Sequence, residues 1–122
     1  MISVSNLSIK LGTFSLQDVT LQVARGQYAV LMGRTGSGKT SILEAICGLR
    51  PIGAGRIELA GRDVTRLKPA ARGIGYVPQD GALFVTMTIR EHLAFALRTR
   101  RWSQAATQQR VMELAELLEI DH

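Results

Sequence analysis

The feature that most constrains this chain is the glycine-rich stretch GRTGSGKT at residues 33–40. It matches the pattern G-x-x-x-x-G-K-[ST] at every fixed position. The uncharged residues 28–32 precede it and predict a buried strand, while residues 41–47 follow it with apolar side chains spaced for one face of a helix. A strand, a glycine-rich loop and a helix in this order predict a phosphate-binding loop in an α/β fold.

Each residue type in this loop suits a bound triphosphate. Gly33, Gly36 and Gly38 carry no Cβ, so the backbone can turn tightly and bring its N–H groups against phosphate oxygens. The helix is expected to begin at about Lys39, which directs its free N–H groups and positive dipole end at the same anion. Lys39 supplies a mobile charge for the β- and γ-phosphates, and the Thr40 hydroxyl is the expected Mg²⁺ ligand. The alternative is a Gly/Ser-rich turn before an ordinary helix.

Composition indicates a globular protein with one small domain. The 122 residues are 46% hydrophobic, and no apolar run approaches the roughly 20 residues of a membrane span. No signal peptide is visible at the N-terminus, and the single Cys47 fits a cytosolic protein. The net charge of +5 raises the question of a nucleic-acid partner. The only basic cluster, at 98–101, suits a solvated helix end, so no nucleic acid is expected.

The first half of the chain predicts mainly short strands. Residues 2–9 alternate apolar and polar side chains, with a slip near Asn6, and residues 19–23 read as their antiparallel partner. After the loop helix, which is expected to end at Gly48, residues 56–59 predict another strand. A polar connection at 67–72, with a possible helical turn, leads to a short strand at 73–79 that Pro78 stops.

The second half predicts an irregular segment and two helices. Residues 80–87 are irregular but apolar, so they require cover from the core or from a partner. Residues 88–91 match a helix capping box, and the helix that they open carries Leu93, Ala94 and Leu97 on one side. Ser103 can cap a last helix, which presents apolar side chains at helical spacing and is expected to end near 120–122.

These residues together resemble the N-terminal half of an ABC-type ATPase. The segments that carry the resemblance, besides the loop, are ICGL at 46–49, GRIELAGRDV at 55–64 and RGIGYVPQ at 72–79. The chain is most similar to importers of molybdate, tungstate or sulfate. The resemblance implies an ABC-type P-loop NTPase fold, in which 1–80 form the phosphate-loop core with an antiparallel β subdomain. Residues 81–122 would then hold the Q-loop and the start of a helical subdomain.

The resemblance also implies roles for particular residues. Gln79 would be the Q-loop glutamine, which contacts Mg²⁺ or the water near the γ-phosphate; the alternative is a solvated turn residue after Pro78. Lys39 and Gln79 are therefore the catalytic candidates, and Thr40 and Gln79 are the candidate metal ligands. The candidate residues for binding ATP are Gly33, Arg34, Thr35, Gly36, Ser37, Gly38, Lys39, Thr40 and Ser41, with Leu11 and Phe14 for the adenine.

The sequence departs from the family pattern in several places. Leu11 stands where the family usually stacks an aromatic residue on adenine, and Phe14 is a nearby substitute. Arg34 replaces a common proline, and Val85-Thr86 replaces the more usual Pro-His. A signature motif like LSGGQ and an apolar strand ending in Asp-Glu are both absent from the sequence, and neither histidine can be assigned as the switch histidine.

The expected function is the ATP-binding subunit of an ABC importer, on the inner face of the cell membrane. The chain would bind ATP and Mg²⁺ without hydrolysing ATP alone, as part of a longer ATPase. Its partners would be transmembrane permease subunits, through residues 81–87, and a second ATPase subunit in a homodimer. Three alternatives remain: a small-molecule kinase, a non-catalytic ATP-dependent interaction module, and an ABC ATPase of DNA repair or translation.

Overall fold

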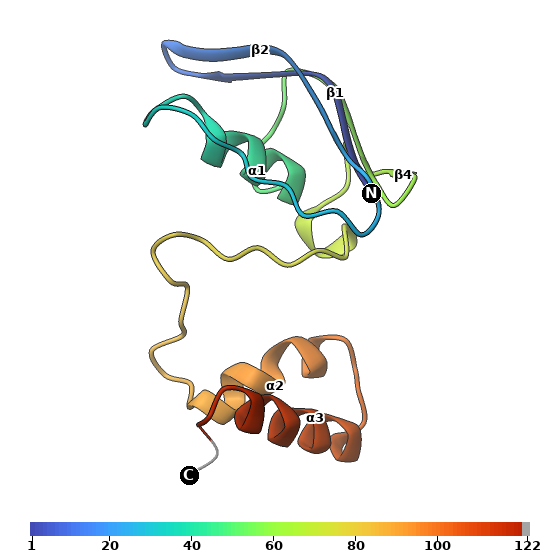
Figure 1. The fold of residues 1–122 in the computed structure, drawn as a ribbon, viewed down its shortest axis with the longest axis vertical. Helices are drawn as coiled ribbons and strands as arrows, with labels where there is room; N and C mark the ends of the chain where they lie inside the picture. The colour runs from blue at the N-terminus through green and yellow to red at the C-terminus, as the bar shows by residue number, and fades with distance from the viewer. Residues whose placement is uncertain (121–122) are drawn as a thin grey trace. The chain divides into compact units, whose positions relative to one another are not determined.

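The computed structural model describes residues 1–120 of the chain. They fall into two compact units, Met1–Tyr76 and a second unit that begins at Val77. The first unit contains a sheet and one longer helix, and the second contains two helices (Figure 1).

The first unit opens with the predicted hairpin. Strand β1 (Ile2–Leu11) pairs antiparallel with β2 (Phe14–Val23), and Leu11 lies opposite Phe14 at the turn. The predicted slip is confirmed, because the register shifts between Val4 and Leu7, where Asn6 has a φ of 49°. The Asn6 side-chain amide donates to Asp18, which has a φ of 57° in the facing strand. These two irregular residues keep the apolar side chains on one face on both sides of the slip.

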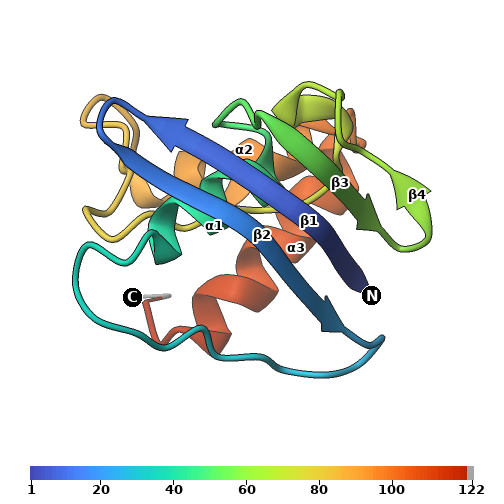
Figure 2. The same cartoon turned by 90° about the horizontal axis from the view of Figure 1, so that it is seen from above.

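The sheet has the order β2-β1-β3-β4 and is antiparallel throughout. Strand β3 (Ala54–Leu59) includes the predicted strand 56–59, and β4 (Arg62–Asp63) returns beside it. Helix α1 (Lys39–Cys47) covers one face of this sheet, as Figure 2 shows. The buried core between them consists of Val4, Leu7, Ile9, Ile42, Ala45, Ile46, Ile57, Leu59 and Val64. The expected helical turn is the 3₁₀ segment Pro69–Ala71.

Two strand predictions are wrong. Residues 28–32 and 73–79 form no strand, and Tyr28 is 94% exposed and Val77 91% exposed. An apolar segment becomes a strand only when another strand satisfies its backbone N–H and C=O groups. Among residues 1–120, the paired strands are the four of the antiparallel sheet, and neither segment joins them. Both segments have an apolar composition, but no strand among residues 1–120 pairs with either of them.

The second unit contains the two predicted helices, α2 (Ile89–Thr99) and α3 (Gln104–Leu117). They pack through the predicted face of α2, where Ala94 is buried, and through Val111 of α3. Ser103 caps α3, and its hydroxyl accepts from the Ala106 N–H at 3.3 Å. Helix α3 ends before the expected boundary at 120–122, of which 121–122 lie outside the described residues. Within residues 1–120, no helix has the length and hydropathy that crossing a membrane requires.

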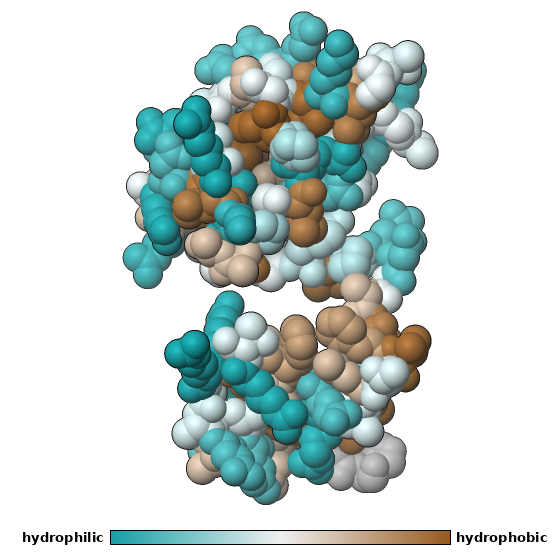
Figure 3. Space-filling model, turned by 180° about the vertical axis from the view of Figure 1, so that it is seen from behind, coloured by the Kyte–Doolittle hydropathy of each residue, from teal (hydrophilic) through white to brown (hydrophobic). Residues whose placement is uncertain are grey.

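Residues 80–87 are irregular, as predicted, and most of them are exposed. Leu83 is 74% exposed and Val85 is fully exposed, and Figure 3 shows hydrophobic side chains at the surface of this unit. Phe84 is tied to α2, because its N–H donates to His92 Nε2 at 2.9 Å and its ring stacks on the His92 ring. His92 therefore packs locally against Phe84.

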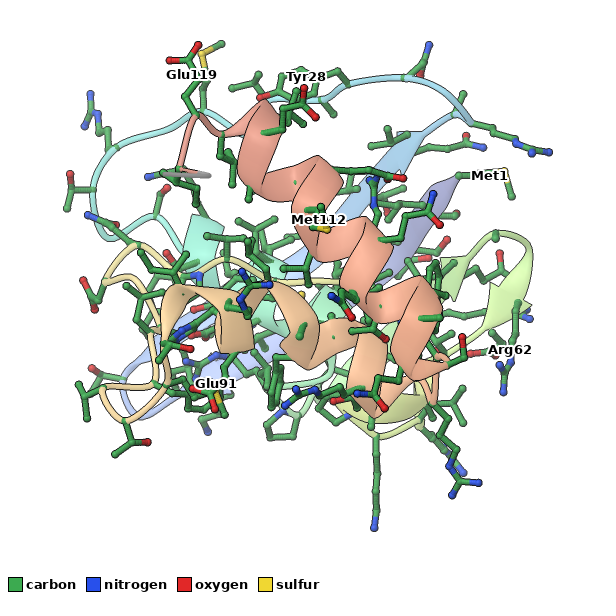
Figure 4. All side chains as sticks on the ribbon, turned by 90° about the horizontal axis from the view of Figure 1, so that it is seen from below. Met1, Tyr28, Arg62, Glu91, Met112 and Glu119 are labelled. Carbon is green, nitrogen blue, oxygen red and sulfur yellow. The ribbon has the colours of Figure 1, made fainter. Side chains whose placement is uncertain are left out.

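The stability of the N-terminal turn of α2 should depend on pH through Glu91, which lies near the start of the helix in Figure 4. The Glu91 carboxylate accepts from the Thr88 N–H at 2.7 Å, and the Thr88 hydroxyl accepts from the Glu91 N–H at 3.3 Å. The Thr88 backbone and hydroxyl bonds lower the pKa of Glu91 from its ordinary value, against a smaller opposite effect of desolvation. Because the folded pKa is the lower one, the carboxylate stabilises the helix above the ordinary glutamate pKa, about 4.3.

We therefore expect this stabilisation to be lost as the pH falls through the folded pKa of Glu91. Hydrogen exchange at the Thr88 and Glu91 amides, measured between about pH 6 and pH 3, should show faster opening at the acid end after correction for intrinsic exchange. Glu91→Gln is the control, because the glutamine amide oxygen can still accept a hydrogen bond but the side chain does not titrate. A wild-type opening equilibrium that does not change over this range would contradict the prediction.

Candidate functional site

The candidate site is built where the loop 33–38 meets the start of α1. Helix α1 begins at Lys39, as predicted, and its N-cap is Gly38 with a φ of 91°. Gly36 has a φ of 79°, so both glycines adopt the left-handed conformation that side chains disfavour. No side chain caps this helix, in contrast to α2 and α3, which Thr88 and Ser103 cap. The first N–H groups of α1 are therefore left for a ligand, and an anion suits them best.

Lys39 folds back over the loop that precedes it. Its ammonium donates to the Gly33 carbonyl at 2.9 Å and to the Arg34 carbonyl at 2.8 Å. The Ser37 N–H also donates to the Arg34 carbonyl, at 3.2 Å, which closes the loop into a turn. An ammonium has three donors, and two of them hold the loop. The third N–H can donate to an anion while the other two keep their bonds to the loop. Lys39 can therefore both shape the loop and provide a positive charge for a bound anion.

One wall beside the loop comes from strand β2. A Cβ on Gly38 would lie 2.6 Å from Leu16 Cδ1 and 3.0 Å from Phe14 Cζ, so both side chains lie against the start of α1. Of the two candidate adenine residues, the structure thus brings Phe14 to the loop. Leu11 instead packs against the hydrophobic core. Leu16 was missed by the sequence reasoning, since nothing local marks an alternating strand residue as a neighbour of Gly38.

The other predicted residues of the loop differ in exposure. Arg34, Thr35, Ser37 and Thr40 are exposed, so their side chains can reach a ligand or a hydrated cation. Ser41 is buried, next to Ile42 of the core. Within residues 1–120 there is no group of three or more His, Cys, Asp or Glu residues that could hold a metal ion. A cation at this loop would therefore need ligand oxygens besides Thr40.

Gln79 and the residues 81–87 belong to the second unit. Gln79 is exposed and lies in a turn that includes Asp80. Its predicted role, and that of Thr40 as a metal ligand, therefore stay predictions.

Arg72, at the far end of α1, is a functional candidate that the sequence reasoning missed. Its side chain is buried, with 8% of the residue exposed, and its guanidinium donates to the Ala45 and Ile46 carbonyls, both at 2.8 Å. Burial lowers the pKa of Arg72, an effect that the nearby Cys47 opposes. Burial likewise raises the pKa of the Cys47 thiol. The carbonyls that Arg72 holds are 26 and 27 residues away in sequence, so no local pattern could have revealed this contact.

Comparison with known proteins assigns this chain to a family. Residues 16–122 match the model of the family described as ABC transporter. The chain belongs to the ABC transporter family. This confirms the resemblance noted in the sequence and the fold class that it implied.

Similar members of the ABC transporter family include import proteins. The chain is 39% identical to the molybdate/tungstate import ATP-binding protein WtpC of Thermococcus kodakarensis, over 100% of this chain and 37% of that protein. It is 40% identical to the sulfate/thiosulfate import ATP-binding protein CysA of Nocardia farcinica, over 99% of this chain and 37% of that protein. The chain thus spans little more than a third of the length of these curated relatives.

Solved structures of ABC proteins share the fold. An ATP-binding subunit of an ABC transporter aligns with a TM-score of 0.84 and 28% identity, over 98% of this chain and 51% of that one. A dimeric ATP-binding cassette in a post-hydrolysis state, bound to ADP and Pi, aligns with a TM-score of 0.80 and 23% identity, over 98% and 57% of the two chains. The antiparallel sheet with α1 and the helices α2 and α3 are thus parts of the ABC ATPase fold.

Proposed function

We propose that this chain is the nucleotide-binding part of an ABC importer ATP-binding subunit, and that it binds ATP with Mg²⁺ at residues 33–41. The observation that carries the proposal is the start of α1, where uncapped N–H groups and the Lys39 ammonium converge on one loop. Exposed Thr40 is adjacent, and the left-handed Gly36 and Gly38 allow the backbone to approach phosphate oxygens closely. The residues present therefore fit a nucleoside triphosphate.

Each residue has a distinct task in this proposal. The loop amides and the first N–H groups of α1 bind phosphate oxygens, and Lys39 neutralises charge on the β- and γ-phosphates. The Thr40 hydroxyl would provide one oxygen to a bound Mg²⁺. Mg²⁺ supplies neutralisation of the charge that develops on the phosphates. Gln79 orients the attacking water or contacts the metal in the intact ATPase.

The proposed whole protein hydrolyses ATP, whereas these residues by themselves bind it. Attack of water on the γ-phosphate needs a positioned water and a general base or its equivalent. The sequence contains no LSGGQ-like motif and no strand ending in Asp-Glu to provide the remaining groups. The relatives that the chain matches are almost three times its length, which leaves room for both motifs in the complete subunit.

The transported solute and the partners follow from the relatives' names and from the exposed segment 81–87. Relatives named for molybdate, tungstate and sulfate import favour a tetrahedral oxyanion as the solute. Exposed Leu83, Phe84 and Val85 favour contact of 81–87 with transmembrane permease subunits on the inner face of the membrane. A second ATPase subunit would complete the nucleotide site in a dimer, as the dimeric state of a structural neighbour suggests.

Calorimetric titration of MgATP into the 122-residue chain tests the central proposal. We expect a single saturable site, and we expect pyrophosphate to compete for it because the loop recognises phosphate rather than the base. Adding small-molecule phosphate acceptors tests the kinase alternative, which predicts acceptor-dependent turnover. The absence of saturable binding under conditions in which circular dichroism reports a folded chain would contradict the proposal.

Phe14 should contribute to binding of the adenine rather than of the phosphates. Its ring lies against Gly38 at the edge of the loop, and stacking of a base on an aromatic ring is worth about 1–3 kcal/mol. We therefore expect Phe14→Leu to weaken ATP binding by roughly tenfold. Binding of pyrophosphate should remain unchanged, and Phe14→Tyr, which keeps the ring, should bind ATP like the wild type. Equal losses for ATP and pyrophosphate in Phe14→Leu would mean that the ring only supports the loop.

A further inference from the structure

One guanidinium connects the end of helix α1 to the segment that follows strand β4. Arg72 Nη1 donates to the Ala45 and Ile46 carbonyls, and Nε donates to the Leu67 carbonyl at 2.9 Å. Its Nη2 donates to the Thr65 carbonyl at 3.1 Å. Two of these acceptors belong to α1 and two to residues 65–67, so a single side chain fixes these two parts of the first unit to each other.

The acceptor side of this contact is itself anchored to the sheet. The Thr65 hydroxyl accepts from the Ile57 N–H of β3 at 2.9 Å and donates to Asp63 Oδ1 of β4 at 2.6 Å. The backbone of Arg72 is also held, because its N–H donates to the Pro69 carbonyl at 3.1 Å. Arg72 therefore joins α1 to a segment that is itself hydrogen-bonded to strands β3 and β4.

The positive charge of Arg72 lies at the C-terminal end of helix α1, beside the Ala45 and Ile46 carbonyls. The C-terminal carbonyls of a helix carry partial negative charge, and a cation there is stabilising. Within residues 1–120, no carboxylate lies within ion-pair distance of Arg72, so carbonyl oxygens are its described partners. Gly48 makes room for the guanidinium, since a Cβ at that position would lie 2.5 Å from Arg72 Nε. The absence of a side chain at Gly48 is therefore what allows the buried Arg72 guanidinium to reach the end of α1.

Helix α1 is short, so its position depends on tertiary contacts: its core residues Ile42, Ala45 and Ile46 pack against the sheet, and Arg72 holds its C-terminal end. The helix has 9 residues, and an isolated helix shorter than about 12–15 residues is marginal in water. Its first turn carries Lys39 and Thr40 and has no capping side chain, so the position of that turn depends on how the rest of the helix is held. The Glu44–Arg50 ion pair is partly buried, but it joins α1 only to the residues that directly follow it, so it cannot fix α1 to the sheet.

We propose that Arg72 is a positioning residue for the phosphate site, which it holds in binding geometry by fixing the C-terminal end of α1. This inference rests on the proposed function, because the site that it serves is the proposed ATP site. It predicts that Arg72 affects nucleotide affinity although its contacts lie at the opposite end of the helix. A residue that only adds stability would lower the melting temperature and leave the affinity of the folded chain unchanged.

The test compares Arg72→Met, Arg72→Lys and the control Arg50→Met. MgATP affinity is measured well below the melting temperature of each variant. Arg72→Met removes the guanidinium donor from four carbonyls, of which Ala45 still accepts from the Gly48 N–H, and we expect at least a roughly tenfold loss of affinity. Arg72→Lys keeps the charge but lacks the planar fork, so it should recover only part of that loss, and it protects the test if the methionine variant does not fold. Arg50→Met, at the same end of α1, should bind like the wild type.

A second measurement needs no nucleotide. Hydrogen exchange at the Ile42 and Ser37 amides, which donate to the Gly38 and Arg34 carbonyls, reports the geometry of the loop. We expect faster exchange in both Arg72 variants and unchanged exchange in Arg50→Met. Wild-type exchange at these amides in Arg72→Lys, or full affinity in a folded Arg72 variant, would overturn the inference. If the wild-type chain does not bind MgATP, the proposed function fails. The exchange rates of the Arg72 variants then still test whether Arg72 holds the loop in its geometry.

Discussion

Replacing Lys39 with alanine should weaken MgATP binding by about ten- to a hundredfold or more. Lys39 has the only side-chain ammonium described at this loop, where it already donates to the Gly33 and Arg34 carbonyls. A hydrogen bond to a charged group contributes about 1.5–3 kcal/mol, and each 1.4 kcal/mol is a tenfold change in affinity. The loss should be largest for nucleotides with a γ-phosphate, so ATP should be affected more than ADP, and titration calorimetry with both nucleotides measures it.

The alanine variant should remain folded, because the loop that Lys39 closes is exposed. The two bonds to the loop carbonyls are exposed, so water can replace them, and we expect the free energy of unfolding to change by only about 1 kcal/mol, less than such charged bonds contribute when water is excluded. Lys68→Ala is the matched control, since it removes an exposed lysine of the same unit and should leave the affinity unchanged. Equal affinity of Lys39→Ala and the wild type would place the nucleotide elsewhere or exclude it.

Local features of this chain could be predicted because they depend on near neighbours in sequence. The capping box needs only Thr88 and Glu91, and the end of α1 needs only a glycine that can adopt a φ of 79°. The slip in β1 follows from an interruption of alternation beside Asn6. The glycine-rich loop before α1 belongs to the same class, because its pattern specifies the turn and the helix start together.

Features that depend on distant partners could not be predicted in this way. Residues 28–32 have the composition of a buried strand, but pairing decides whether a strand forms, and no strand among residues 1–120 pairs with them. Parallel neighbours of such a segment come from distant crossover connections, which composition does not reveal. Leu16 beside Gly38 and Arg72 at the end of α1 are likewise contacts between distant residues. The sequence therefore predicted the turn and the helix start of the loop better than it predicted which distant residues hold the loop in place.

The second large effect is expected at Gly55, where Gly55→Ala should destabilise the first unit by roughly 3–5 kcal/mol. Gly55 has a φ of 100° in β3, and a Cβ there would lie 2.6 Å from the Asn6 carbonyl oxygen and 2.7 Å from Leu7 Cα. Both neighbours are backbone atoms of β1, so neither can move aside as a flexible side chain would. Strained backbone costs about 1–3 kcal/mol, and overpacking costs a further 1–3 kcal/mol.

The size of this effect follows from the slip in β1. Asn6 occupies a left-handed conformation, and the pairing of β1 with β3 shifts register between Ser5 and Ser8, opposite Gly55. The slip turns the β1 backbone toward β3, and only a residue without Cβ fits there. A loss of 3–5 kcal/mol is a large part of the roughly 5–15 kcal/mol that stabilises a typical domain, so much of the population should unfold under mild denaturant.

Gly61→Ala separates the two causes. Gly61 has a φ of 82° in the turn between β3 and β4, but nothing lies within 4 Å of its Cβ position. This control should therefore lose only the roughly 1–2 kcal/mol of backbone strain. Urea denaturation of both variants, followed by circular dichroism, gives the difference between them. If Gly55→Ala and Gly61→Ala have the same midpoint, the close approach of β3 to the slip in β1 is not a constraint on this fold.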